Sequence, residues 1–166
     1  MSEKRFVPVL LVIALVAAVG GVAANSGGDD REFKAALSGA NEVPAVTTRA
    51  SGKAEFEVNS DLTKIEFELE LRNATNILGA AGAHIHCAPA GANGPIVAFL
   101  ASPVTGGFNG KVEIQATLTD ANIVNPACGT TIAALVQSMK DGMTYVNAHS
   151  PAFPAGEIRG QIEGDD

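Results

Sequence analysis

The amino-acid sequence predicts an all-β protein: an antiparallel, Greek-key-like β-sandwich of about eight strands with one short helix inserted. Beyond residue 30, apolar and polar residues alternate with a period of two, which is typical of strands that bury one face. Short runs containing Gly, Pro, Asn and Asp separate these stretches, as hairpin turns and loops require. Only one stretch has a helical period instead. Many short strands at such spacing favour a sandwich or a barrel.

The first 24 residues differ from the rest of the chain and predict a secretory signal peptide. Lys4 and Arg5 form a short basic start, the run from Phe6 to Ala24 is almost entirely apolar, and Val22-Ala23-Ala24 resembles an A-x-A cleavage site. The apolar run approaches the roughly 20 residues that span a bilayer, so an uncleaved N-terminal anchor is the alternative. Either segment would export the domain, which predicts an extracellular, periplasmic or cell-surface location. Contact with a membrane is expected only if the segment is uncleaved.

The remainder of the chain is long enough for one domain with a sizeable core. We expect a short polar linker at residues 25–30, the domain at residues 31–163 and an acidic tail at residues 164–166. The formal net charge of the chain is −7, and no run of basic residues occurs. Because nucleic acids and anionic lipids attract basic surfaces, this balance argues against a nucleic-acid partner.

The expected strands follow one another along the domain. The clearest is residues 64–73, KIEFELELRN, where Ile65, Phe67 and Leu69 alternate with charged residues. Asn59-Ser60-Asp61 precedes this strand and predicts a hairpin turn. The full set of expected strands is residues 33–37, 53–59, 64–73, 82–87, 95–100, 111–118, 143–149 and 157–163.

The stretch at residues 128–142 predicts the helix. Its apolar residues recur at positions i, i+3, i+4 and i+7, a stripe that one face of a helix would bury. Thr130 or Thr131 can cap the start of the helix, and Gly142 follows its end. The stripe consists of Ile132, Leu135, Val136 and Met139.

Cys87 and Cys128 are the two cysteines of the chain, and both lie in the expected domain. An even number of cysteines in an exported protein predicts a disulfide. The alternative is that Cys87 is a metal ligand beside two nearby histidines. Because side chains alternate between the faces of a strand, Cys87 would point away from His84 and His86, and we favour the disulfide.

The histidines form the candidate site. His84 and His86 lie two residues apart in an expected strand and therefore share one face. His149 ends a later expected strand, and Glu157 begins the last one. If these strands are neighbours, three imidazoles converge, a ligand set that suits copper or zinc with one position open. Glu157 would then be a fourth ligand or would orient a ring.

A simpler interpretation exists for each of these residues. His84 and His86 could be solvated, and His149 could begin a loop. Glu157 and Arg159 lie two apart on one expected strand, so a surface ion pair between them is a further alternative to a role at a metal.

Two motifs resemble the CHRD domain, a domain of chordin that also occurs singly in many microbial exported proteins. They are GAHIHCAPAGANGPIVAFL at residues 82–100 and DGMTYVNAHSPAFPAGEIRGQI at residues 141–162. The opening FKAALSGANEVPAVTTRASGKAEFEV, residues 33–58, also fits this family. The resemblance covers about residues 31–163. The motifs of this family assign no enzymatic activity and no catalytic residue.

A weaker resemblance, to copper–zinc superoxide dismutase, rests on the G-x-H-x-H pattern of residues 82–86. That enzyme is a Greek-key β-sandwich with such a strand in its copper site. Three histidines are too few for its bridged copper–zinc pair, so the resemblance implies a lone copper site at most.

The leading hypothesis is therefore a non-enzymatic exported binding module that takes a single copper or zinc ion or an unknown extracellular ligand. The alternatives are a copper-dependent redox enzyme of superoxide-dismutase-like architecture and a purely structural surface domain.

Overall fold

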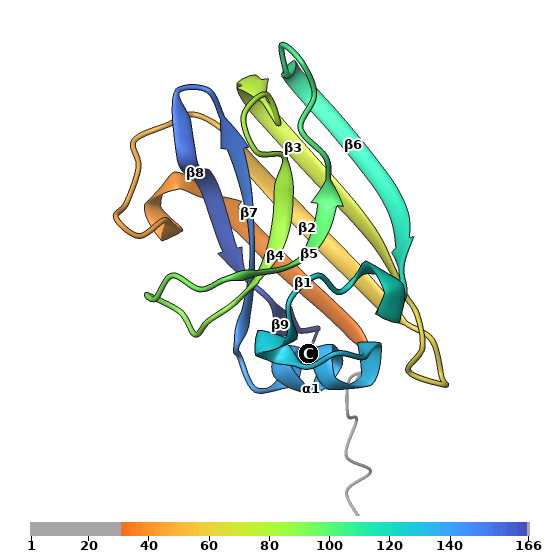
Figure 1. The fold of residues 1–166 in the computed structure, drawn as a ribbon. Helices are drawn as coiled ribbons and strands as arrows, with labels where there is room; N and C mark the ends of the chain where they lie inside the picture. Colours follow the sequence, from red (N-terminus) through yellow and green to blue (C-terminus); the bar gives the residue numbers. More distant parts are fainter. Residues whose placement is uncertain (1–30, 166) are drawn as a thin grey trace, which may run out of the picture.

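An antiparallel sheet of nine strands is the scaffold of the protein in the computed structural model, which describes residues 31–165 (Figure 1). Hydrogen bonds connect the strands in the order β5-β4-β7-β8-β1-β2-β3-β6, and β9 pairs with β1. The all-β prediction is confirmed, and the count exceeds the expected eight by the two-residue β9. The strands are β1 (Glu32–Ser38), β2 (Ser51–Val58), β3 (Ile65–Ile77), β4 (Ala83–Cys87), β5 (Ile96–Ala101), β6 (Phe108–Leu118), β7 (Thr144–Ser150), β8 (Phe153–Gln161) and β9 (Glu163–Gly164).

The sheet folds over so that two layers of four strands face each other (Figure 1). One layer contains β5, β4, β7 and β8, and the other contains β1, β2, β3 and β6. The layers join where Ser38 of β1 pairs with Arg159 of β8. After β3 the chain forms the β4–β5 hairpin in the other layer and then returns to place β6 beside β3. The result is a nearly closed, sandwich-like fold, as the sequence predicts.

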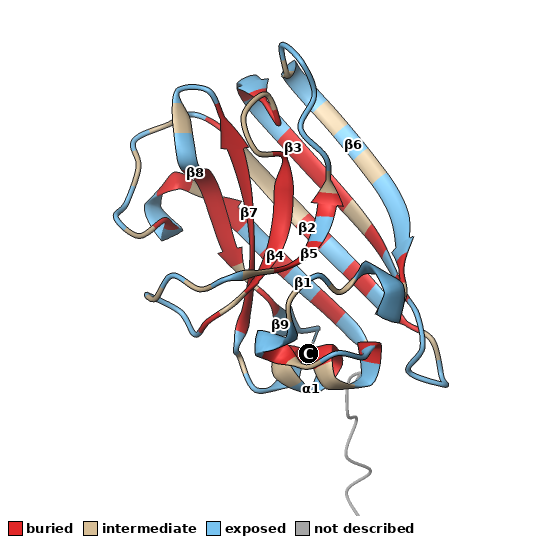
Figure 2. Cartoon of the chain, in the orientation of Figure 1, coloured by how far each residue is buried: buried red, intermediate tan, exposed pale blue. Residues whose placement is uncertain are grey.

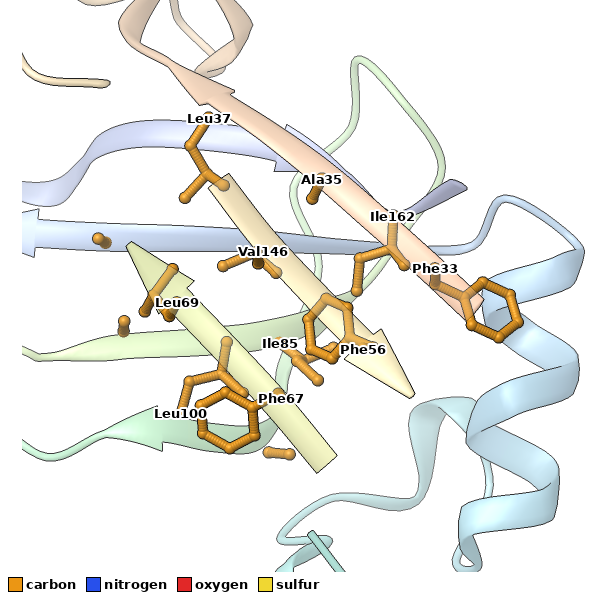
Figure 3. Close-up of a cluster of buried hydrophobic side chains, with 14 of the residues drawn as sticks. Phe33, Ala35, Leu37, Phe56, Phe67, Leu69, Ile85, Leu100, Val146 and Ile162 are labelled. Carbon is orange, nitrogen blue, oxygen red and sulfur yellow. The ribbon is translucent and has the colours of Figure 1, made fainter. Parts of the chain in front are cut away.

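The core lies between the two layers (Figure 3). Exposed and buried residues alternate along β1 and β2, and the buried set faces the opposite layer. Phe56 on β2 is directly opposite Phe67 on β3, and the two ring centroids are 6.4 Å apart. Because successive side chains of a strand point to opposite faces, the two-residue period places one half of each strand in this core.

Strand β7 does not follow the alternating pattern, since all seven of its residues are buried (Figure 2). Val146 faces the core with the other apolar residues. Asn147 and His149 lie on the opposite, outer face of the strand, yet they are only 3% and 6% exposed. The outer face of this layer is therefore covered by other parts of the chain.

Two loops contribute to that cover. Residues 39–50 connect β1 to β2, and residues 88–95 connect β4 to β5. The Asn93 side chain donates a hydrogen bond of 2.7 Å to the Val43 carbonyl and so joins the two loops. Arg159 of β8 lies beneath residues 88–95 and donates hydrogen bonds to two of their carbonyl groups.

The predicted helix and disulfide are also present. Helix α1 (Ile132–Lys140) lies at one end of the sandwich, and the Thr131 hydroxyl accepts a hydrogen bond from the Ala134 N–H at its start (Figure 1). The four residues of the predicted apolar stripe are all buried. Cys87 and Cys128 form a disulfide with Cα atoms 5.7 Å apart, which joins the end of β4 to the 3-10 turn before α1.

Among residues 31–165, no helix is both long enough and apolar enough to cross a bilayer. The predicted signal peptide at residues 1–24 and the linker at residues 25–30 lie outside the described residues, so both stay predictions. At the other end, Glu163 and Gly164 extend the sheet by pairing with Lys34 and Phe33 of β1.

Candidate metal centre

Three histidines converge on the outer face of the β4–β7 pair. His84 and His86 are on β4 and His149 is on β7, and these strands pair so that His84 is opposite Asn147. The three residues are 1%, 8% and 6% exposed. One ring nitrogen from each histidine can be chosen so that all three lie within 4.8 Å of one another. In the part of the chain that the structure describes, this is the only group of three or more His, Cys, Asp or Glu side chains close enough to hold a metal ion.

Backbone carbonyls fix the protonation of two of the rings. His86 Nδ1 is 2.9 Å from the Gly94 carbonyl, and His149 Nδ1 is 3.0 Å from the Pro154 carbonyl. A carbonyl only accepts hydrogen bonds, so each Nδ1 carries the proton and each Nε2 of the neutral rings has a free lone pair. His86 Nε2 is buried and has no hydrogen-bond partner. The arrangement presents two Nε2 atoms in the form that binds metals.

His84 completes the group. Its Nδ1 is 3.2 Å from His149 Nε2, while its own Nε2 is buried without a partner. The edge of the His84 ring meets Phe99 of β5 with centroids 4.8 Å apart, and Phe99 is 44% exposed. Phe99 is therefore a half-exposed aromatic side chain between His84 and the solvent.

All three rings have pKa values below the ordinary 6.5 of histidine. Burial is the largest cause for His84, whose pKa falls to about 4, and the charges of His149 and His86 lower it further. Burial also lowers the pKa of His86 and that of His149. The rings are therefore neutral at pH 7, as metal binding requires.

A stack of side chains supports His86 from the side of β8. Tyr145 of β7 lies parallel to the His86 ring, with centroids 4.8 Å apart and an interplanar angle of 11°. The Arg159 guanidinium carbon is 3.4 Å from the centroid of the Tyr145 ring. Arg159 also donates to Asn93 and to the Pro89 and Ala92 carbonyls, so residues 88–95 hold the stack in place. A surface ion pair between Glu157 and Arg159, the simpler expectation from sequence, is not among the ion pairs of residues 31–165.

The structure does not bring Glu157 into the histidine group. Its Oε1 accepts a hydrogen bond of 2.7 Å from the Thr48 hydroxyl in the first covering loop, and its Oε2 is buried without a partner. The register of β7 and β8 shifts between the Ala148–Ile158 and Ser150–Phe153 pairs. Such an irregularity changes the direction of nearby side chains, which alternation along a strand does not reveal.

Asn147 and Glu42 carry no role that the sequence predicts. Asn147 is two residues before His149, so the period of two places both residues on one face of the strand. Glu42 lies in the first covering loop, is 7% exposed and packs its carboxylate against Gly156. Burial raises the pKa of Glu42 to about 7, against the opposing charge of Arg159 and a hydrogen bond from the Val43 backbone. No pattern in the sequence points to this buried carboxyl.

Comparison with known protein families identifies the chain. The family model described as the CHRD domain matches residues 33–162, which contain all three histidines, both cysteines and the whole of the two-layered sheet except its outermost residues. The chain belongs to the CHRD domain family, as its motifs predict. Neither the curated proteins nor the solved structures include a significant match.

Proposed function

We propose that this member of the CHRD domain family is a non-enzymatic, exported binding module whose His84, His86 and His149 hold a single copper or zinc ion. The observation that carries the proposal is the buried His86 Nε2, which has no hydrogen-bond partner, in one group with His84 Nδ1 and His149 Nε2, which are 3.2 Å apart. An unsatisfied buried polar atom typically costs a protein about 1–3 kcal/mol. A bound cation would supply the missing partner of His86.

The donor chemistry supports a transition metal. Neutral imidazoles bind copper and zinc well, whereas calcium and magnesium prefer oxygen ligands. The hydrogen bonds from His86 Nδ1 to Gly94 and from His149 Nδ1 to Pro154 are the kind of outer contacts that orient metal-binding rings. For nitrogen ligands the intrinsic order of affinity favours Cu(II) over Zn(II).

Export is part of the proposal because the disulfide and the N-terminal sequence agree. The Cys87–Cys128 bond would persist in an oxidising compartment and would be rare in a reducing cytosol. The basic and apolar pattern of residues 4–24 supplies the expected signal.

Metal titration of the full chain, purified without a histidine tag, tests the proposal. We expect one equivalent of Cu(II) to bind in competition with a chromophoric chelator, and Zn(II) to bind more weakly. His149→Ala should weaken binding as strongly as His84→Ala or His86→Ala, although His149 is distant in sequence. Gln115→Ala, which alters an exposed residue of β6, is the matched control and should bind as the parent does. A His149→Ala protein that binds copper like the parent would exclude the three-histidine site.

A further inference from the structure

A fourth polar group, the Asn147 carboxamide, lies among the three histidine rings. Asn147 is two residues before His149 on β7, directly opposite His84 on β4, and 3% exposed. Its Oδ1 is 3.0 Å from His149 Nε2. The Asn147 side chain also interacts with the rings of His84 and His86, in each case favouring the protonated ring and so opposing the larger effect of burial on the pKa.

The contact between Asn147 and His149 joins two acceptors. The Pro154 carbonyl takes the Nδ1 proton of His149, so Nε2 of the neutral ring carries a lone pair. An amide oxygen also has only lone pairs to offer. Two such atoms at 3.0 Å repel each other unless a positive group lies between or beside them. In a hydrogen-bonded arrangement the amide nitrogen, with its two N–H groups, would face Nε2 instead.

We propose that the Asn147 amide oxygen is the fourth ligand of the ion that the three histidines hold, an inference that rests on the proposed function. In a four-coordinate site with metal–nitrogen bonds of about 2.0 Å, neighbouring ligand atoms are about 3.3 Å apart. The separations of His149 Nε2 from His84 Nδ1, 3.2 Å, and from Asn147 Oδ1, 3.0 Å, are close to this value. The donor set is three nitrogens and one oxygen, all uncharged.

If Asn147 is a ligand, two substitutions should change the Zn(II) affinity in opposite directions. Asn147→Leu keeps a similar volume but removes the oxygen, so Zn(II) affinity should fall about 10-fold to 100-fold. Asn147→Asp replaces a neutral oxygen by a charged one beside a dication, so Zn(II) affinity should rise. If Asn147 instead holds His149 Nε2 through an N–H, the amide competes with the metal, and Asn147→Leu should bind Zn(II) more tightly than the parent.

The experiment is a Zn(II) titration of the parent full chain and both variants, untagged, by chelator competition. Gln115→Leu, which removes an exposed amide on β6, is the control for the loss of a carboxamide. Thermal unfolding without metal shows whether each variant folds. If Asn147→Leu does not fold, Asn147→Asp decides alone, because affinity equal to or weaker than the parent's would contradict direct ligation.

The two proposals fail in different ways. If the parent binds no stoichiometric metal, the proposed function is wrong and the ligand assignment is wrong with it. If the parent binds one ion and Asn147→Leu binds it as tightly or more tightly, only the role of Asn147 is overturned.

Discussion

The outer faces of the two layers differ in what covers them, and this difference separates the candidate site from the rest of the surface (Figure 2). On β2 and β3 the outward residues include Glu57 and Glu66, which are exposed. On β7 the outward residues Asn147 and His149 are almost completely buried. Both faces are polar, because outward polar residues alternate with inward apolar residues in the sequences of β2 and β7. Residues 39–50 and 88–95 contact the polar face of β4, β7 and β8 at Glu157, His86 and Arg159.

Burial changes the energetics of ionisable side chains on the two faces. Glu57 and Glu66 are directly opposite each other across β2 and β3, and water around exposed carboxylates keeps their repulsion small. Between the loops and the outer face of β4, β7 and β8, by contrast, desolvation lowers the pKa values of the three histidines and raises that of Glu42, which belongs to the first loop. A buried polar atom there needs a hydrogen-bond partner. Glu42 Oε1, His86 Nε2 and Glu157 Oε2 have none among the residues that the structure describes.

Replacing Arg159 should produce the largest change in stability. Arg159 is 1% exposed, donates three hydrogen bonds to residues 88–95 and stacks on Tyr145. Arg159→Ala should lower the free energy of unfolding by about 2–4 kcal/mol, because it removes a buried side chain together with its three hydrogen bonds and its stacking on Tyr145. Chemical denaturation measures this, with Lys64→Ala on an exposed turn as the control, expected to change stability by less than about 0.5 kcal/mol. Equal effects of the two substitutions would contradict the view that the loops and Arg159 form one covered unit.

Much of this architecture can be predicted from the sequence because it depends on local periods. The alternation of Ile65, Phe67 and Leu69 predicts β3, and the stripe from Ile132 to Met139 predicts α1. The cover over β7 cannot be predicted in this way. It depends on where residues 39–50 and 88–95 fold back, and those positions are set by long-range contacts such as Asn93 to Val43. This is why Arg159 reads as a surface residue in the sequence and is among the most buried in the structure.

The histidine group was predictable in part for the same reason. Alternation places His84 and His86 on one face, but only the pairing of β4 with β7 brings His149 to them. Alternation also suggests Glu157 for the group, and the register shift between β7 and β8 together with Thr48 accounts for its different position. Local sequence defines faces, whereas strand order and bulges define neighbours.

Replacing Glu42 should produce the next largest change in stability, and this change should depend on pH. The pKa of Glu42 is about 7 in the folded protein and near 4.5 when unfolded, so the folded state binds more protons between these values. The contribution of this carboxyl to stability is therefore greatest below pH 4.5 and is lost as the pH rises to about 7. Glu42→Gln, which stays neutral, should become more stable relative to the parent by roughly 1–3 kcal/mol between pH 4.5 and pH 8.

The exposed Glu57 provides the matched control for that measurement. Urea denaturation of Glu57→Gln and of the parent at the same pH values should give a nearly constant difference, because water screens an exposed carboxylate. If the Glu42→Gln difference is equally flat, Glu42 is solvated and its carboxylate does not pack against Gly156 of β8.

The smallest expected effect is a gain in stability from a substitution on the exposed outer face of β2 and β3. Glu66 is directly opposite Glu57, and like charges at paired positions of a sheet are unfavourable. Glu66→Lys should therefore stabilise the protein by about 0.5 kcal/mol at low ionic strength, since it replaces a repulsion by an attraction between exposed groups. The gain should largely disappear in 1 M salt, where the screening length falls to about 3 Å. Glu66→Gln separates the two contributions, because it removes the repulsion without adding an ion pair, and it should fall between the parent and Glu66→Lys. A loss of stability in Glu66→Lys, or a gain that persists in 1 M salt, would mean that this face is not simply a solvated surface and would remove the contrast with the covered face of β7.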